Sequence, residues 1–241
     1  MKDNSSKFNK DNSNKELKPE NIDQSGNFEN CFLTASSCIL KKDLNQALEI
    51  YKKVLSVEPD NVQALNCAGS VLFFMEKFDE SLEYFKKLNT INPKDPCVYY
   101  NMGNIFAEKG EYEKAIEHYK KAVEFNPNSS EFYSALGLAY QDIQEYEHAV
   151  ENYSKAIELD RENFENYVNL ASVYMQISEF EKAVEFYKKA IEYNPGGYKS
   201  YICVGNGYLM LREFDNAYEY YLKGIEVNPE YSDAYLCYGI A

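Results

Sequence analysis

The sequence has no tryptophan, only two arginines (Arg161 and Arg212) and no pair of cysteines spaced C-x-x-C. It also lacks any run of about 18 apolar residues, the length that a membrane-spanning helix needs. The first 27 residues contain no apolar stretch, so they do not resemble a signal peptide. These absences predict a cytoplasmic protein without a membrane span, in which the six cysteines are reduced and serve as small apolar residues.

Basic residues are scarce relative to acidic ones: 25 Lys and Arg stand against 39 Asp and Glu, giving a net charge of −14. Such a surface repels polyanions, which excludes nucleic acid as the main ligand and favours neutral or basic partners. Residues 1–27 are neutral overall, rich in Asn, Ser and Lys, and poor in apolar side chains. This composition predicts a disordered polar tail over 1–27.

Motifs that carry chemistry are also missing. The sequence contains no P-loop, no G-x-G-x-x-G, no H-E-x-x-H and no G-x-S-x-G. Its only histidines, His118 and His148, do not stand beside a cysteine or serine in a nucleophile motif. The many Glu-Lys pairs are typical of a solvated helix face. The sequence therefore predicts a protein that is not an enzyme, with no cofactor and no metal site.

What the sequence does have is a period of 34 residues. Its prolines recur at that interval or at twice that interval, at Pro59, Pro93, Pro127, Pro195 and Pro229. One position of the repeat is small in every block (Ala35, Gly69, Gly103, Gly137, Ala171, Gly205 and Gly239), and another is aromatic (Tyr51, Phe85, Tyr119, Tyr153, Tyr187 and Tyr221). Rings facing small residues are what two closely packed helices need. The period predicts six repeats, 28–61, 62–95, 96–129, 130–163, 164–197 and 198–231, followed by a partial seventh helix over 232–241.

Each block contains two helical segments, the A helix and the B helix of that repeat. In the third block, Asp95 before Pro96 predicts the start of an A helix that runs to Glu108. Gly110 supplies the break, because glycine adopts the left-handed conformation at a helix end. The B helix is expected over 112–125, where Pro127 prevents its continuation. No segment alternates as a β-strand does, so the fold is predicted to be all-α.

These blocks resemble the tetratricopeptide (TPR) repeat, whose pattern is an aromatic residue, Leu-Gly, Tyr, and then Ala, Phe, Ala and Pro. The third block matches with Tyr99, Met102-Gly103, Phe106, Ala115, Tyr119, Ala122 and Pro127. The first block departs from the pattern at Cys31, Thr34 and Cys38, as terminal repeats that cap a stack often do. The resemblance implies a right-handed superhelical solenoid of antiparallel helix pairs, with the A helices lining a concave groove.

The resemblance also implies which side chains face that groove. These are the residues near the start and in the middle of the A helices, and we predict a peptide-binding set of Asn66, Tyr100, Asn101, Asn104, Glu131, Glu165, Asn169 and Asn206. TPR domains that clamp a terminal carboxylate need several cations there, but these positions contain only Lys199. The asparagines instead resemble the ladder by which other TPR domains pair with a peptide backbone. A second explanation is composition, since residues 1–27 alone hold six asparagines.

The leading hypothesis is a non-enzymatic protein-protein interaction scaffold that binds an extended neutral or basic peptide segment in its concave groove. The alternative is the non-catalytic substrate-recognition arm of a longer enzyme, such as an O-GlcNAc-transferase-like glycosyltransferase. A third hypothesis is self-association through an uncapped C-terminal helix at 232–241. Gly196-Gly197 is expected to form the turn between the fifth and sixth blocks, with a hinge as the other interpretation.

Overall fold

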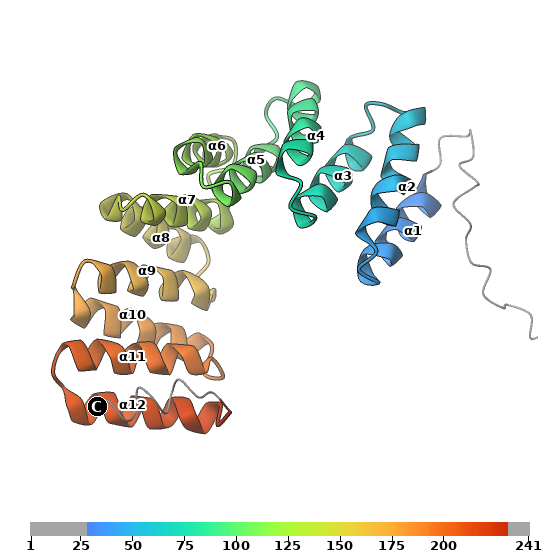
Figure 1. Ribbon diagram of the computed structural model, residues 1–241. Coiled ribbons are helices and arrows are strands. Elements are labelled where there is room, and N and C mark those ends of the chain that lie inside the picture. Colours follow the sequence, from blue (N-terminus) through green and yellow to red (C-terminus); the bar gives the residue numbers. More distant parts are fainter. Residues whose placement is uncertain (1–27, 231–241) are drawn as a thin grey trace, which may run out of the picture. The chain divides into compact units, whose positions relative to one another are not determined.

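The computed structural model describes residues 28–230, which contain twelve α-helices and no β-strand (Figure 1). The predicted tail at 1–27 and the predicted partial helix at 232–241 lie outside the described residues. The chain divides into two compact units, residues 1–91 and 92–241. The first contains α1 (Glu29–Leu40), α2 (Leu44–Val57), α3 (Val62–Phe74) and α4 (Phe78–Ile91). The second contains α5 (Pro96–Glu108), α6 (Tyr112–Phe125), α7 (Ser130–Asp142), α8 (Tyr146–Leu159), α9 (Phe164–Gln176), α10 (Phe180–Tyr193), α11 (Tyr198–Met210) and α12 (Phe214–Val227).

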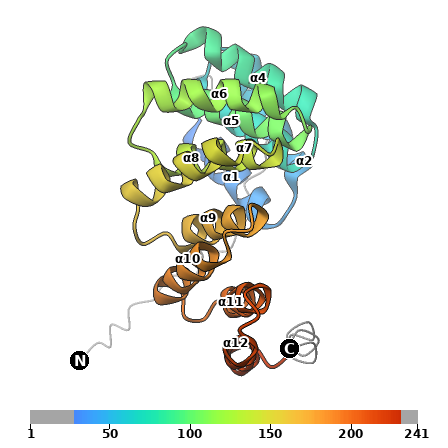
Figure 2. The ribbon, with the colours of Figure 1, turned by 90° about the vertical axis from the view of Figure 1, so that its left-hand side faces the viewer.

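Within each unit every helix packs against the next one along the chain, so the odd-numbered A helices and even-numbered B helices form stacked pairs (Figures 1 and 2). The helix bounds of the third repeat are those that the sequence predicts, and the Asp95 carboxylate accepts a hydrogen bond from the Cys97 N–H at 2.9 Å. The prediction of an all-α fold of paired helices is confirmed. None of the five cysteines that the structure describes is in a disulfide with another of them, and Cys237 lies outside the described residues.

Aromatic rings of the B helices lie against small residues of the A helices. Tyr153 of α8 is fully buried, and a Cβ atom added to Gly137 of α7 would lie 3.0 Å from its ring. The same contact recurs between Gly69 and Phe85 in the first unit. The small residue brings the two helix axes close enough for the ring to fill the space between them.

The turn from each A helix to its B helix uses the left-handed backbone conformation. Gly110 adopts it with φ of 72°, as the sequence predicts. In the other five repeats, however, a residue with a side chain stands there at φ of 58° to 63°: Lys42, Glu76, Gln144, Ser178 and Arg212. Helix packing on both sides therefore imposes this turn even where no glycine is present to adopt it readily.

The first helix differs from the other A helices on the side that meets a preceding B helix. On α3 that side carries Ala64, Ala68 and Val71, all buried, and α2 packs against α3. The matching positions of α1 are Asn30, Thr34 and Ser37, none of which is buried. The departure of the first block from the repeat pattern thus places polar side chains on a helix face that is apolar in the next repeat.

Replacing Gly137 with leucine should destabilise the protein by about 1–3 kcal/mol, because the new side chain overpacks the contact with Tyr153. Thermal or urea unfolding followed by circular dichroism measures the change. Gly196→Ala is the control, since its added Cβ would meet only the Asn194 side chain, at 3.8 Å. Equal stability of the two variants would contradict the packing described here.

Replacing Gln144 with glycine should stabilise the protein by about 0.5–1 kcal/mol, because glycine occupies the left-handed region without a steric penalty. Urea unfolding provides the free energy. The matched control, Glu151→Gly in the middle of α8, should instead lower stability by about 1 kcal/mol. A loss of stability in Gln144→Gly would show that the turn carries no strain.

Candidate functional site

The predicted groove residues lie on the A helices, and all but one belong to the second unit. Asn66 is an exposed residue of α3 in the first unit. In the second unit α5 contacts α7, and α7 contacts α9. These three helices carry Tyr100, Asn101, Asn104, Glu131, Glu165 and Asn169, while Asn206 lies on α11. The second unit is therefore where most of the predicted side chains share a set of neighbouring helices.

A pocket of about 550 Å³ lies between α9 and α11. Two predicted residues, Glu165 and Asn169, line it. The other lining residues are Phe164, Val168, Asn194, Gly196, Gly197, Tyr198, Lys199, Ser200 and Cys203. The A-helix positions that the repeat assigns to the groove thus surround a real cavity in this part of the chain.

The first unit has a pocket at the equivalent place. It measures about 490 Å³ and is lined by Phe28, Glu29, Phe32, Leu33, Ser36, Asn61 and Gln63. Glu29 stands four repeats before Glu165, and Asn61 stands four repeats before Gly197. The same junction between consecutive A helices is therefore open in both units.

Two of the predicted asparagines are held by tyrosines of the core. Tyr119 donates a hydrogen bond from its hydroxyl to Asn104 Oδ1 at 2.7 Å, and Tyr221 donates to Asn206 Oδ1 at 2.8 Å. Both rings are buried, so each phenol needs an acceptor for its single proton. The bond turns the amide oxygen toward the core and fixes the orientation of each asparagine side chain.

Tyr100 interacts with two other predicted residues, Asn104 and Glu131. Its ring centroid lies 5.8 Å from that of Tyr119 and 5.1 Å from that of Phe132 on α7. Burial is the main cause that raises the pKa of Tyr100 to about 12. The neighbouring Glu131 carboxylate also raises this pKa, whereas a hydrogen bond with Asn104 lowers it. Tyr100, Asn104 and Glu131 therefore form one polar cluster across α5 and α7. Asn104 consequently has bonding partners within the protein, and sequence reasoning missed this because it counted Tyr119 only as a core ring and Tyr100 only as a groove residue.

The remaining asparagines are placed differently. Asn101 and Asn169 occupy the same position of their repeats, and both are half-buried. Asn169 lines the pocket between α9 and α11. Sequence reasoning missed Asn194 as a lining residue, and it treated Gly196 and Gly197 only as a turn or hinge. The signal that could have found them is the glycine at 197, where other repeats carry a helix-capping side chain.

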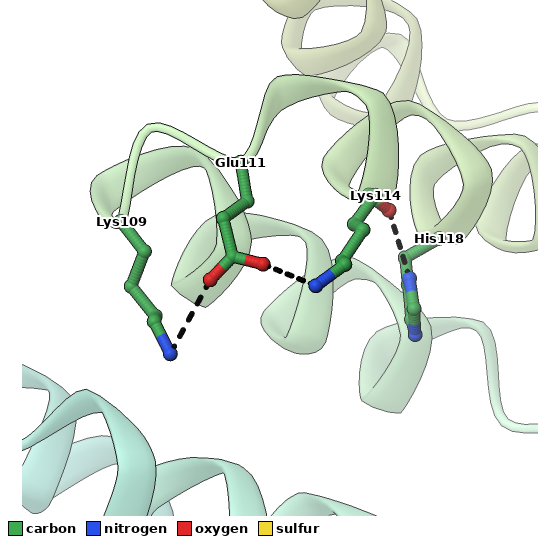
Figure 3. A network of polar contacts seen from close by, with 4 residues as sticks. All are labelled: Lys109, Glu111, Lys114 and His118. Carbon is green, nitrogen blue, oxygen red and sulfur yellow. Dashed lines mark hydrogen bonds and ion pairs between the residues drawn. The ribbon is translucent and has the colours of Figure 1, made fainter.

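The histidines lie among surface charges and aromatic rings. In the network of Figure 3, Lys109 pairs with Glu111 at 3.4 Å and Glu111 pairs with Lys114. His118 Nδ1 lies 2.8 Å from the Lys114 carbonyl oxygen (Figure 3). Burial lowers the pKa of His118, although this hydrogen bond opposes the shift. The His118 ring also packs against those of Tyr99 and Phe106, with centroid distances of 6.3 Å and 4.9 Å, and His118 is half-buried.

Two further findings concern the described residues alone. Between residues 28 and 230, no three His, Cys, Asp or Glu side chains gather closely enough to bind a metal ion. In the same range, no helix has both the length and the apolar character that crossing a membrane would demand.

Several solved structures are similar to this chain. The structure of the MamA protein is 28% identical, covers 70% of this chain and 92% of its own, and superposes with a TM-score of 0.65. PilF of Pseudomonas aeruginosa, at 18% identity, covers 88% and 95% with a TM-score of 0.71. YrrB, described as a TPR protein with an unusual peptide-binding site, is 17% identical, covers 77% and 96%, and has a TM-score of 0.63. The similarity to PilF and to YrrB shows a shared fold alone. No curated protein matches the sequence.

Family models match the sequence over most of its described length. Models described as TPR repeat match residues 103–144 and 142–178, and models described as tetratricopeptide repeat match 28–61, 62–95, 84–117 and 165–196. Together these matches run from residue 28 to residue 196, which is more than half of the chain. The chain therefore belongs to the tetratricopeptide repeat family.

Proposed function

We propose that this protein is a non-enzymatic interaction scaffold that binds an extended segment of another protein along the A helices of its second unit. The observation that carries the proposal is the pocket between α9 and α11, because Glu165 and Asn169 line it together with apolar side chains. Cavities of a few hundred cubic ångströms with a few polar groups are typical of ligand sites. The peptide-binding site named in the description of YrrB, a protein of the same fold, supports it as well.

The segment is neutral or basic. Glu131 and Glu165 are both exposed, on helices that contact each other. The protein carries a net charge of −14, so an acidic segment would be repelled as it approached. Attraction between exposed charges is screened by salt, and binding is therefore weaker at high ionic strength.

Asn101 and Asn169 are the asparagines best placed to pair with a peptide backbone. Asn104 and Asn206 already accept hydrogen bonds from buried tyrosines. Removing either amide would take away the acceptor of a buried tyrosine hydroxyl, which itself destabilises the protein. Asn101 and Asn169 are half-buried and share one position of the repeat, so an extended chain lying across the A helices would pass both.

The double variant Asn101→Ala with Asn169→Ala should bind its ligand roughly tenfold more weakly, since each lost hydrogen bond costs about 0.5–1.5 kcal/mol. Ligands are selected from a displayed library of random dodecapeptides on the immobilised chain, and fluorescence polarisation provides their affinities. The control is Asn128→Ala in the exposed turn before α7. Unchanged affinity in the double variant, with the circular dichroism spectrum of the parent, would remove the asparagines from the binding site.

A further inference from the structure

The pocket between α9 and α11 has a glycine at the position that caps other A helices. Asn61, Asp95 and Asn163 precede α3, α5 and α9 and accept a hydrogen bond from a backbone N–H of the helix that follows. Gly197 stands at the equivalent position before α11, which has no side-chain cap. In the equivalent pocket of the first unit, Asn61 is one of the lining residues. Beside Gly197 the lining side chain is that of Asn194, which lies 3.1 Å from where a Cβ atom of residue 197 would stand.

A second position of the repeat also differs at this pocket. Val168 lines it from α9. The matching residues are Phe32 on α1 and Tyr100 on α5, and the ring of Tyr100 packs against those of Tyr119 and Phe132. Valine is much smaller than either aromatic residue. The wall that α9 contributes to this pocket is therefore less bulky here than the wall that Phe32 of α1 contributes in the first unit.

The walls of this pocket are mostly apolar, with charges of both signs at its edge. Phe164, Val168 and Tyr198 supply apolar surface. Glu165 of α9 and Lys199 of α11 are both exposed, so the edge has no net charge. A charged side chain entering between these walls would lose its hydration without a matching gain, whereas an apolar side chain would be stabilised by burial.

The surroundings differ on the two sides of the pocket. On the side of α9, the neighbouring helix is α7, which contacts α9. Each of these two helices carries an exposed carboxylate, Glu131 on α7 and Glu165 on α9. On the other side stands the single cation Lys199. A bound segment could place an apolar side chain in the pocket and its next residue near α7. If that next residue were basic, its charge would complement the carboxylates of Glu131 and Glu165.

We propose that the pocket between α9 and α11 is an anchor subsite that takes one large apolar side chain of the partner segment, beside a lysine or arginine that pairs with Glu165. The proposal rests on the proposed function and specifies which residues of the segment the second unit recognises. Leucine, methionine and phenylalanine bury more apolar surface than alanine does against Phe164, Val168 and Tyr198 of this pocket.

Blocked peptides test the side-chain preference. The probes are four hexapeptides, acetyl-Ala-Ala-Lys-X-Ala-Ala-amide, in which X is Leu, Phe, Ala or Glu. They are titrated into the full chain while NMR follows the Gly197 N–H and the side-chain amides of Asn169 and Asn194. The leucine and phenylalanine peptides should bind roughly tenfold or more tightly than the alanine peptide, with the glutamate peptide weakest. Equal affinities for leucine and alanine would overturn the proposal.

Variants that fill the pocket provide a second test. Val168→Tyr copies Tyr100, and Gly197→Asn copies Asn163, so each introduces a residue that this chain already carries at that position of the repeat. Both variants should lose the preference for leucine over alanine. Gly197 has φ of −82°, which asparagine adopts readily, but its Cβ atom would stand 3.1 to 3.3 Å from Asn194, so Asn194 has to shift. The melting temperature of Gly197→Asn therefore checks that the variant is folded. Gln176→Glu, which copies Glu108 on an exposed part of α9, is the control and should change neither quantity.

The basic neighbour is tested by changing the lysine of the leucine peptide to alanine. This change should weaken binding at low salt, and Glu165→Gln should remove the difference between the two peptides. An undiminished preference for lysine in Glu165→Gln would show that another group recognises it.

Failure of this proposal can be told apart from failure of the proposed function. If the Asn101→Ala, Asn169→Ala variant weakens the selected dodecapeptides while Val168→Tyr and Gly197→Asn do not, the A helices bind the segment outside this pocket. The anchor subsite is then wrong and the scaffold function stands. If none of these variants alters binding of the dodecapeptides, both are wrong.

Discussion

The contact between an aromatic ring of a B helix and a small residue of its A helix determines the geometry on which everything else in this protein depends. In four of the six repeats the small residue is a glycine, and a single added carbon would meet the ring. The ring fixes how closely the two helices approach, and this distance fixes how the next pair packs. Because each helix pairs with the next one along the chain within each unit, one local contact repeated every 34 residues builds the stack.

The same rings connect the core to the surface that we propose binds a partner. Tyr119 and Tyr221 have buried rings, but their hydroxyls reach Asn104 and Asn206 on the A helices. Tyr153 reaches Gln141 of α7 at 3.2 Å in a similar way. The side chains of Asn104, Asn206 and Gln141 are therefore held in place by hydroxyl groups of the core.

Much of the fold could be predicted from the sequence because periodicity and helix-capping residues report local physics. Asp95 and Pro96 mark the start of α5, and Gly110 marks its end. The turns at Gln144 and Arg212 were not evident, because their left-handed conformation comes from the packing of the helices around them and not from the residues themselves. Part of the candidate site was likewise hidden. Repeat positions identified Glu165 and Asn169, but Asn194 and Gly197 line the pocket because of how the turn before α11 folds, which the repeat pattern does not report.

The polar face of α1 has a consequence for how copies of this protein can meet. Asn30, Thr34 and Ser37 stand where α3 has Ala64, Ala68 and Val71. A B helix from another molecule that approached this face would have to dehydrate amide and hydroxyl groups without burying apolar surface in return. Docking of such a helix on Asn30, Thr34 and Ser37 is thereby disfavoured relative to the packing of α2 on α3.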